Sequence, residues 1–467
     1  MGFALLSQFV SPAAQAVESP PILVARHYRC HCGQPVFFRN SQCLTCNTPL
    51  GYDPARGVLL PLISGPQADT WLAWPAAPVK AGRTRRPRSP KGLAAAQALA
   101  VVEARALAEN ATAETPVYKR CLNVATPALC NWLLPANDPQ ALCPACRLNH
   151  TTPDLNNPDQ PDNGELWGRV EMAKRRMVSS LILLRLPVAS RVNEDPERGL
   201  MFDFLRACGD QPHVMTGHDT GLITINLEEA DDAKREAVRK AMREPYRTLL
   251  GHFRHEVGHY YWDRLVNGTP WLDGFHQLFG DETQDYAASL KRSYEQGPPA
   301  DWPQHFVSAY ASTHPWEDWA ECWAHYLHMR DGIDTAQSLG LGLARLDLEF
   351  TPFKAGDLYL PNDPGAAQFL AILNHWTRLS TLLNEMSRSM GQIDFYPFAL
   401  PRQVVGKLQF IHLVVTSLSW LQTPRPAEAL PVLPVSQALV QPPQPELQPP
   451  PLAPQLEPAL NGQTQQA

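Results

Sequence analysis

The HExxH motif at residues 255–259 constrains the fold most, because its two histidines share a metal only when they lie on one face of a helix. Residues 246–263 contain no proline and are predicted to form that helix. Residues four apart lie on the same helix face, so His255 and His259 can bind one Zn²⁺. Zinc lowers the pKa of a bound water molecule, and Glu256 can take the proton from that water. The motif predicts zinc-dependent hydrolysis of peptide bonds, with Glu256 as the general base.

Two histidines leave a catalytic zinc site incomplete, since such sites normally have three protein ligands and one open position. Metzincins place a third histidine six residues after the second, but this chain has Leu265 there. A second helix is predicted to start at Pro315, because proline suits a first helical turn and acidic residues suit the positive end of the helix dipole. Glu317 and Glu321 share one face of this helix.

The spacing of these two glutamates resembles the ExxxE arrangement of gluzincins. The resemblance implies that Glu317 is the third zinc ligand and that Glu321 hydrogen-bonds a ligand histidine to fix its tautomer. Asp318 is the alternative ligand, and the roles of the two glutamates could be exchanged.

Peptide hydrolysis also needs a hydrogen-bond donor for the negatively charged tetrahedral oxygen. Gluzincins commonly use a tyrosine or a histidine for this purpose. Tyr310, about two helical turns before Glu317, is the first candidate here, and His314 is the second. Asp263 lies four residues beyond His259 on the same face, and is the candidate for a contact behind the ligands.

Eight of the ten cysteines fall into two groups before residue 150, with the short spacings of zinc sites. The first group predicts a zinc ribbon with a closed, structural site made by Cys30, Cys32, Cys43 and Cys46. Its first pair has one intervening residue instead of the commoner two, so His27 or His31 could replace one cysteine.

The second group predicts another structural Zn²⁺, bound by Cys121, Cys130, Cys143 and Cys146. A reactive disulfide within this group is the alternative. Cysteines that bind zinc stay reduced, and no export signal is evident, so the sequence predicts a cytoplasmic location. With the active site, the expected total is three zinc ions.

A chain of 467 residues can hold two or three domains. Its net charge of −6 does not indicate a nucleic-acid-binding protein, and no apolar run is long enough to cross a membrane. A short basic run at residues 83–91 could contact nucleic acid or an acidic partner, although a solvated linker is the simpler interpretation.

The predicted fold class is α+β, with two cysteine-rich modules before a mainly helical, zincin-like catalytic domain. The predicted segments are a flexible leader (1–26), a zinc ribbon (27–60), a linker or insertion (61–113), a second Cys₄ module (114–150), a metallopeptidase domain (160–422) and a disordered Pro/Gln-rich tail (423–467). Within the catalytic domain, residues 221–227 are predicted to form the edge strand that lines the cleft. Helices are predicted over 165–184, 363–389 and 400–420.

These motifs, together with the segments 216–226, 244–263 and 314–321, resemble the bacterial family of zinc-binding metallopeptidases with an N-terminal zinc-ribbon domain. The likeness covers roughly residues 27–420. It implies a gluzincin-like catalytic domain and supplies no established substrate.

The leading hypothesis is a zinc peptidase that acts on polypeptides, with the cysteine-rich modules recruiting or orienting the substrate. In the alternative, the zincin domain is a silent scaffold and the ribbons bind protein or nucleic acid, although the intact Glu256 argues against it. A third possibility is a protease that a ribbon directs to proteins bound on nucleic acid.

Overall fold

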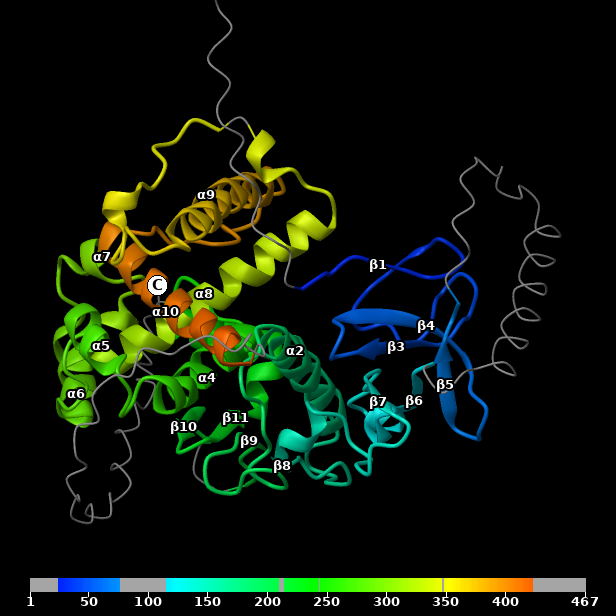
Figure 1. Ribbon diagram of the computed structural model, residues 1–467. Coiled ribbons are helices and arrows are strands. Elements are labelled where there is room, and N and C mark those ends of the chain that lie inside the picture. Colours follow the sequence, from blue (N-terminus) through cyan, green and yellow to red (C-terminus); the bar gives the residue numbers. More distant parts are fainter. Residues whose placement is uncertain (1–23, 76–114, 210–213, 243, 347, 423–467) are drawn as a thin grey trace, which may run out of the picture.

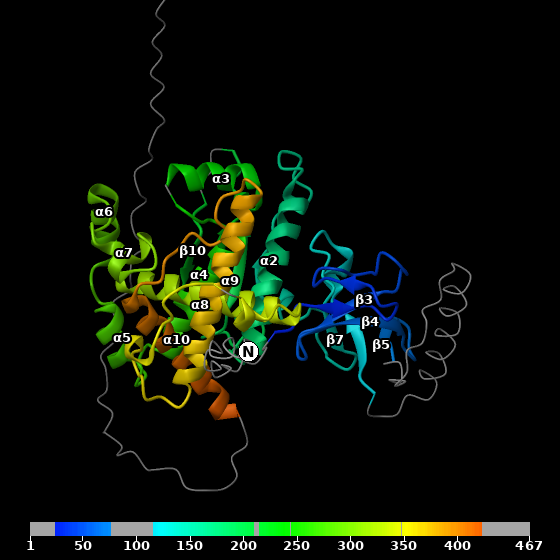
Figure 2. The ribbon, with the colours of Figure 1, turned by 90° about the horizontal axis from the view of Figure 1, so that it is seen from above.

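The computed structural model describes residues 24–75, 115–209, 214–242, 244–346 and 348–422. Figure 1 shows a smaller body of strands beside a larger, mainly helical body, and helix α2 (Asn163–Leu183) lies on the side of the helical body that faces the strands. The view from above shows the same separation (Figure 2). The predicted α+β class is therefore confirmed. Residues 1–23, the basic run at 83–91 and the tail at 423–467 lie outside the described residues.

The N-terminal body contains a five-stranded antiparallel sheet, whose strands follow sequence order from β3 to β7, and a separate antiparallel pair of β1 and β2. The strands of this body are β1 (Tyr28–Arg29), β2 (Pro35–Val36), β3 (Leu50–Asp53), β4 (Val58–Ser64), β5 (Thr70–Ala73), β6 (Val117–Arg120) and β7 (Leu133–Pro135). The predicted division into a ribbon, a linker and a second module needs correction, because residues 61–73 complete β4 and form β5. Buried Leu62 and Leu72 hold this segment in the sheet, and β5 pairs with β6.

The sheet of the helical body has the strand order β10-β11-β9-β8. Its strands are β8 (Asn149–Thr151), β9 (Met201–Leu205), β10 (Gly217–Asp219) and β11 (Leu222–Asn226). The strand predicted at 221–227 is confirmed as β11, but its predicted place at the edge is wrong. A two-residue turn, with positive φ at Thr220 and Gly221, folds β10 back along β11 and gives β10 the edge position.

The helices lie mainly to one side of this sheet (Figure 1), and the predicted helices at 165–184, 363–389 and 400–420 are present as α2, α9 and α10. The helices after α2 are α3 (Asp232–Ala241), α4 (Leu249–Leu265), α5 (Leu272–Phe279), α6 (Tyr286–Gln296), α7 (Trp302–His305), α8 (Pro315–Ser338), α9 (Ala366–Ser389) and α10 (Arg402–Gln422). In the described part of the chain, no helix is long and apolar enough to cross a membrane.

Helices α4 and α8 cross at very close range, and this crossing sets the geometry of the HExxH motif. A Cβ atom at Gly258 would lie only 3.0 Å from the Cα of Ala320, so any larger residue at this position of α4 would push the two helices apart by a few tenths of an ångström. The indole Nε1 of Trp319, a fully buried residue of α8, donates to the Gly258 carbonyl at 2.8 Å. The two helices that carry the predicted ligands are therefore held in a fixed register.

The end of the predicted leader packs against the helical body. Val24 and Arg26 are buried, and the backbone N–H of Val24 donates to the Asp334 carboxylate of α8. Residues 24–26 of the predicted leader therefore belong to the folded part of the chain. The reason is electrostatic, since the Arg26 guanidinium forms a buried ion pair with Asp331 of α8 at 2.9 Å.

Candidate metal centre

Helix α4 presents His255, Glu256 and His259 toward the first turn of α8. The Thr248 hydroxyl caps α4 by accepting a hydrogen bond from the Gly251 N–H at 3.0 Å. Both histidines are held in the interior, with side chains 14% and 8% exposed. Capping and close packing thus place the motif on a rigid helix.

Glu317, in the first turn of α8, completes a group of three potential metal ligands. Its Oε2 atom lies 3.0 Å from His255 Nε2 and 3.6 Å from His259 Nε2. Ligand atoms around a tetrahedral zinc ion are about 3.4 Å apart. Glu317 Oε2 is also buried, and in the described part of the chain it forms no well-aligned hydrogen bond. The three side chains fit a zinc ion.

Asp318, the alternative ligand, points elsewhere. Its carboxylate forms a buried ion pair with Lys407 of α10. Burial raises the pKa of Asp318 to about 6, although Lys407 acts in the opposite direction. The structure therefore brings Glu317, and not Asp318, to the histidines.

Glu321 lies one turn further along α8 and contacts the far side of His255. Its Oε1 is 2.8 Å from His255 Nδ1, and its Oε2 accepts a hydrogen bond from the Ser308 hydroxyl at 2.6 Å. Such a contact fixes the tautomer of a ligand histidine, so that Nε2 is free to face a metal. Glu317 is therefore the glutamate that lies beside the Nε2 atoms of both histidines, and Glu321 lies beside Nδ1 of His255.

Glu256 is largely buried beside the metal ligands, with 9% of its surface exposed. Burial raises the pKa of its carboxyl group, while the neighbouring His255 and His259 lower it. A carboxylate whose pKa is shifted toward neutral accepts a proton more readily at physiological pH.

Of the two candidate oxyanion donors, Tyr310 lies at the site and His314 is engaged in holding the helix. The Tyr310 ring centroid is 5.9 Å from that of His255, and 38% of the residue is exposed. His314 Nδ1 accepts from the Trp316 N–H and caps α8, while its Nε2 lies 3.1 Å from the Gln284 carbonyl oxygen. Of these two candidates, Tyr310 is therefore the one whose side chain lies beside a metal ligand, His255.

Asp263 is not brought to a metal ligand. It hydrogen-bonds to Asn267, and within the described residues His259 Nδ1 has no hydrogen-bond partner.

Two further residues lie at the site, although no sequence motif predicts them. Tyr286, at the start of α6, donates to Glu317 Oε1 at 2.5 Å, and the ring of His218 on β10 stacks against His259 with centroids 6.1 Å apart.

Tyr286→Phe is expected to weaken zinc binding at this centre by about tenfold to a hundredfold, because groups that orient a ligand carboxylate have effects of this size. The phenol holds Oε1, which leaves Oε2 facing the two histidines. Competition with a zinc chelator would measure the change. Tyr294→Phe, on the exposed part of the same helix, is the control. Equal zinc affinities for the two variants would show that the Tyr286 contact is dispensable.

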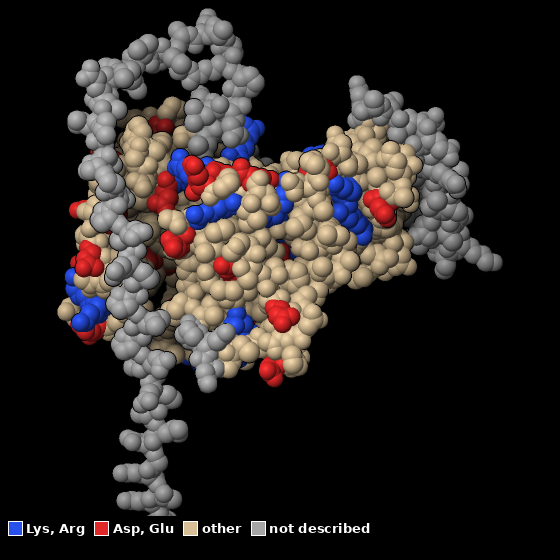
Figure 3. All heavy atoms as spheres, turned by 90° about the horizontal axis from the view of Figure 1, so that it is seen from below, with Lys and Arg blue, Asp and Glu red and all other residues tan. Residues whose placement is uncertain are grey.

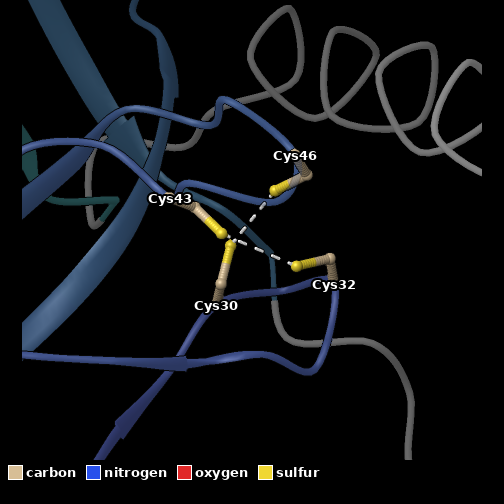
Figure 4. Close-up of side chains that lie close together, drawn as sticks. All are labelled: Cys30, Cys32, Cys43 and Cys46. Atoms are coloured by element: carbon tan, nitrogen blue, oxygen red, sulfur yellow. Dashed lines mark hydrogen bonds between the residues drawn. The ribbon is translucent and has the colours of Figure 1, made fainter.

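The four cysteines of the first group converge, as Figure 4 shows. Sγ atoms are 3.5 Å apart for Cys30 and Cys46, and 3.8 Å apart for Cys32 and Cys43. Thiolates around zinc are expected about 3.8 Å apart. The group that can hold a metal consists of the four cysteines. Of the two alternative ligands, His31 has its Nε2 atom 2.7 Å from the Thr48 hydroxyl and 3.7 Å from Cys46 Sγ.

The four cysteines of the second group also converge, and all of them are buried. The Sγ atoms of Cys130 and Cys143 are 3.7 Å apart, and the Cys143 N–H donates to Cys121 Sγ. None of these four cysteines forms a disulfide, so the alternative of a disulfide is not what the structure contains. The N-terminal body therefore has two closed Cys₄ sites.

Comparison with known proteins agrees with both halves of this architecture. Residues 163–414 match a family described as "putative zinc-binding metallo-peptidase", and residues 27–80 and 91–157 match one described as "zinc-ribbon domain". Uncharacterized proteins of Mycobacterium tuberculosis and Mycobacterium bovis are each 38% identical over 397 residues, which is 84% of this chain and 96% of theirs. No solved structure gives a significant match.

The HExxH helix, the acidic helix beside it and the two Cys₄ sites define a zinc-binding protein of the metallopeptidase class. The chain belongs to the family of zinc-binding metallopeptidases that carry an N-terminal zinc-ribbon domain.

Proposed function

We propose that this protein is a zinc peptidase of the gluzincin type that hydrolyses peptide bonds in polypeptides. The observation that carries the proposal is the convergence of His255, His259 and Glu317 on one point, with the buried Glu256 beside them. Three protein ligands leave one position open for water, as a catalytic zinc site requires.

A zinc ion held there would supply Lewis acidity to water and to the peptide carbonyl. Glu256 accepts the proton of the attacking water and passes it to the leaving nitrogen. Glu321 keeps His255 in the tautomer that offers Nε2, and Tyr286 keeps Glu317 turned toward the histidines. Tyr310 donates a hydrogen bond to the developing oxyanion.

The open edge of β10 suits an extended polypeptide, which would add to the sheet as a further strand. The turn at Thr220 and Gly221 makes Asp219 and Leu222 the hydrogen-bonded pair of the hairpin, so the next pair, His218 and Ile223, is not hydrogen-bonded. The main-chain N–H and C=O of His218 therefore face outward and can pair with a substrate. Lys and Arg are interspersed with Asp and Glu on the face in Figure 3, which suits a protein substrate better than nucleic acid.

The direct test is incubation of the zinc-loaded protein with a proteome-derived peptide library, with new termini read by mass spectrometry. Cleavage that stops when a chelator removes the catalytic zinc, and returns when zinc is added, is the expected result. A fully zinc-loaded protein that cuts no peptide in the library would favour the alternative of a silent scaffold.

Three zinc ions per chain are expected, one at the His₂Glu centre and two at the Cys₄ sites. His255→Ala is expected to lower the count to two while the fold persists, whereas Cys143→Ser removes a structural zinc and destabilises the N-terminal body. Elemental analysis gives the count, and circular dichroism reports the fold. A count of two in the wild type would mean that one of these groups does not bind zinc.

Reduced thiols in both Cys₄ groups are the reason to place this protein in the cytoplasm.

We also propose that the N-terminal body recruits or orients substrates. Phe37 and Leu44, beside the first cysteine group, are 63% and 89% exposed and are suited to contact another polypeptide.

A further inference from the structure

A row of side chains on one face of α8 follows α4 away from the metal centre. Glu321 contacts His255, and Asp331, farther along α8, contacts Arg254, the residue that precedes His255. The Arg254 guanidinium also lies 2.6 Å from His328 Nδ1 of α8. The contacts of the consecutive residues Arg254 and His255 therefore fix the position of α4 relative to α8 at two points.

Asp331 receives three guanidinium groups from three separate elements. Its Oδ2 atom is bonded by Arg176 of α2 and by Arg254 of α4, each at 2.8 Å. Its Oδ1 atom is bonded by Arg26, which comes from the segment just before β1, at 2.9 Å. In the described part of the chain, Arg26 is the one residue with a hydrogen bond to Oδ1, so it holds this oxygen while Arg176 and Arg254 hold the other.

The Arg26 side chain is itself fixed at every nitrogen. Nη1 and Nη2 donate to the hydroxyls of Ser179 and Ser180 of α2, at 3.1 and 3.0 Å. The Tyr52 hydroxyl of β3 lies 2.6 Å from the same Ser179 hydroxyl, and the Arg26 side chain is only 2% exposed. One buried guanidinium therefore joins the N-terminal body to α2 and to α8, and α4 is reached from it through Asp331.

We infer that Arg26 is a positioning residue of the metal centre. By holding Asp331 Oδ1, Arg26 keeps Oδ2 facing Arg254, and Arg254 keeps α4 in the register that sets His255 against Glu321 and Glu317. The N-terminal body is then a working part of the metal site, and not only a module for partners. This inference rests on the proposed His₂Glu zinc site, but not on peptide cleavage.

The test is the zinc affinity of the His₂Glu centre in full-length Arg26→Met, measured by competition with 1,10-phenanthroline and by zinc content. His255→Ala identifies the zinc that belongs to this centre. Affinity is expected to fall by about threefold to thirtyfold, the range that coupling over such a network produces. Arg26→Lys, which keeps the charge but not the forked donor, is expected to lie between Met and the wild type. It also serves as the test variant if Arg26→Met does not fold.

Arg147→Met is the matched control, because Arg147 joins the N-terminal body to Glu194 at 2.8 Å and does not touch Asp331. Its zinc affinity is expected to equal that of the wild type. Unchanged affinity in the Arg26 variants, even with a lower melting temperature, would reduce Arg26 to a fold-stabilising residue and overturn the inference. An equal loss in Arg147→Met would also overturn it. If the wild type and His255→Ala hold the same amount of zinc, the proposed metal centre itself fails.

Discussion

Replacing Glu256 with Gln is expected to slow peptide cleavage by about two to four orders of magnitude, without loss of zinc. The amide keeps the size of the side chain but cannot accept a proton. Because burial raises the pKa of the Glu256 carboxyl group, this residue is suited to proton transfer near neutral pH. Cleavage rates of one library peptide, together with zinc content, measure both halves of the expectation.

Glu295→Gln is the control for this experiment, since Glu295 lies on the exposed side of α6 and pairs only with Lys291 in the described part of the chain. Its cleavage rate is expected to match that of the wild type. If Glu256→Gln retained full activity with normal zinc content, either another group would be the general base or a contaminating protease would be responsible. Loss of zinc in Glu256→Gln would mean that this residue supports the metal site and would leave its role as base unproven.

The parts of the metal centre that the sequence predicts are those that local periodicity controls. A helix fixes the relation of residues four apart, so His255 and His259 follow from their spacing alone. The same rule places Glu317 and Glu321 on one face of α8, and the short cysteine spacings predict both Cys₄ groups. Spacing also suggests Asp263, but that residue lies a further turn along α4 and bonds to Asn267.

The parts that the sequence does not predict depend on contacts between distant segments. Tyr286 reaches Glu317 only because α6 folds back on the start of α8, and Ser308 reaches Glu321 from a loop. Neither residue belongs to a motif. The pairing of β5 with β6 is also not predictable from the sequence, because no local pattern indicates which strands pair when residues 76–114 separate them. A tyrosine just after the acidic stretch 280–285 is the weak signal that could have drawn attention to Tyr286.

Asp331→Ala is expected to lower the free energy of unfolding by about 3–5 kcal/mol, the cost of removing one partner from a buried ion pair. The substitution leaves Arg26 and Arg254, both 2% exposed, without their carboxylate. Since these guanidinium groups come from the N-terminal segment and from α4, both bodies lose stability together. Chemical denaturation followed by tryptophan fluorescence measures the change, and a loss below about 1 kcal/mol would mean that water or rearranged side chains replace Asp331.

Asp331→Asn separates the charge of this residue from its shape. Burial raises the pKa of Asp331, but Arg26, Arg176 and Arg254 outweigh it and hold this pKa well below the usual range. The stabilisation is therefore complete above the pKa of the unfolded chain, about 4, and is lost as the pH falls toward the lower pKa of the folded state. The difference in unfolding free energy between the wild type and Asp331→Asn should be constant near pH 7 and should shrink below about pH 5. If this difference in unfolding free energy did not change between pH 7 and pH 3, the charge of Asp331 would contribute little. The lower stability of Asp331→Asn would then come from the different hydrogen-bonding geometry of the amide.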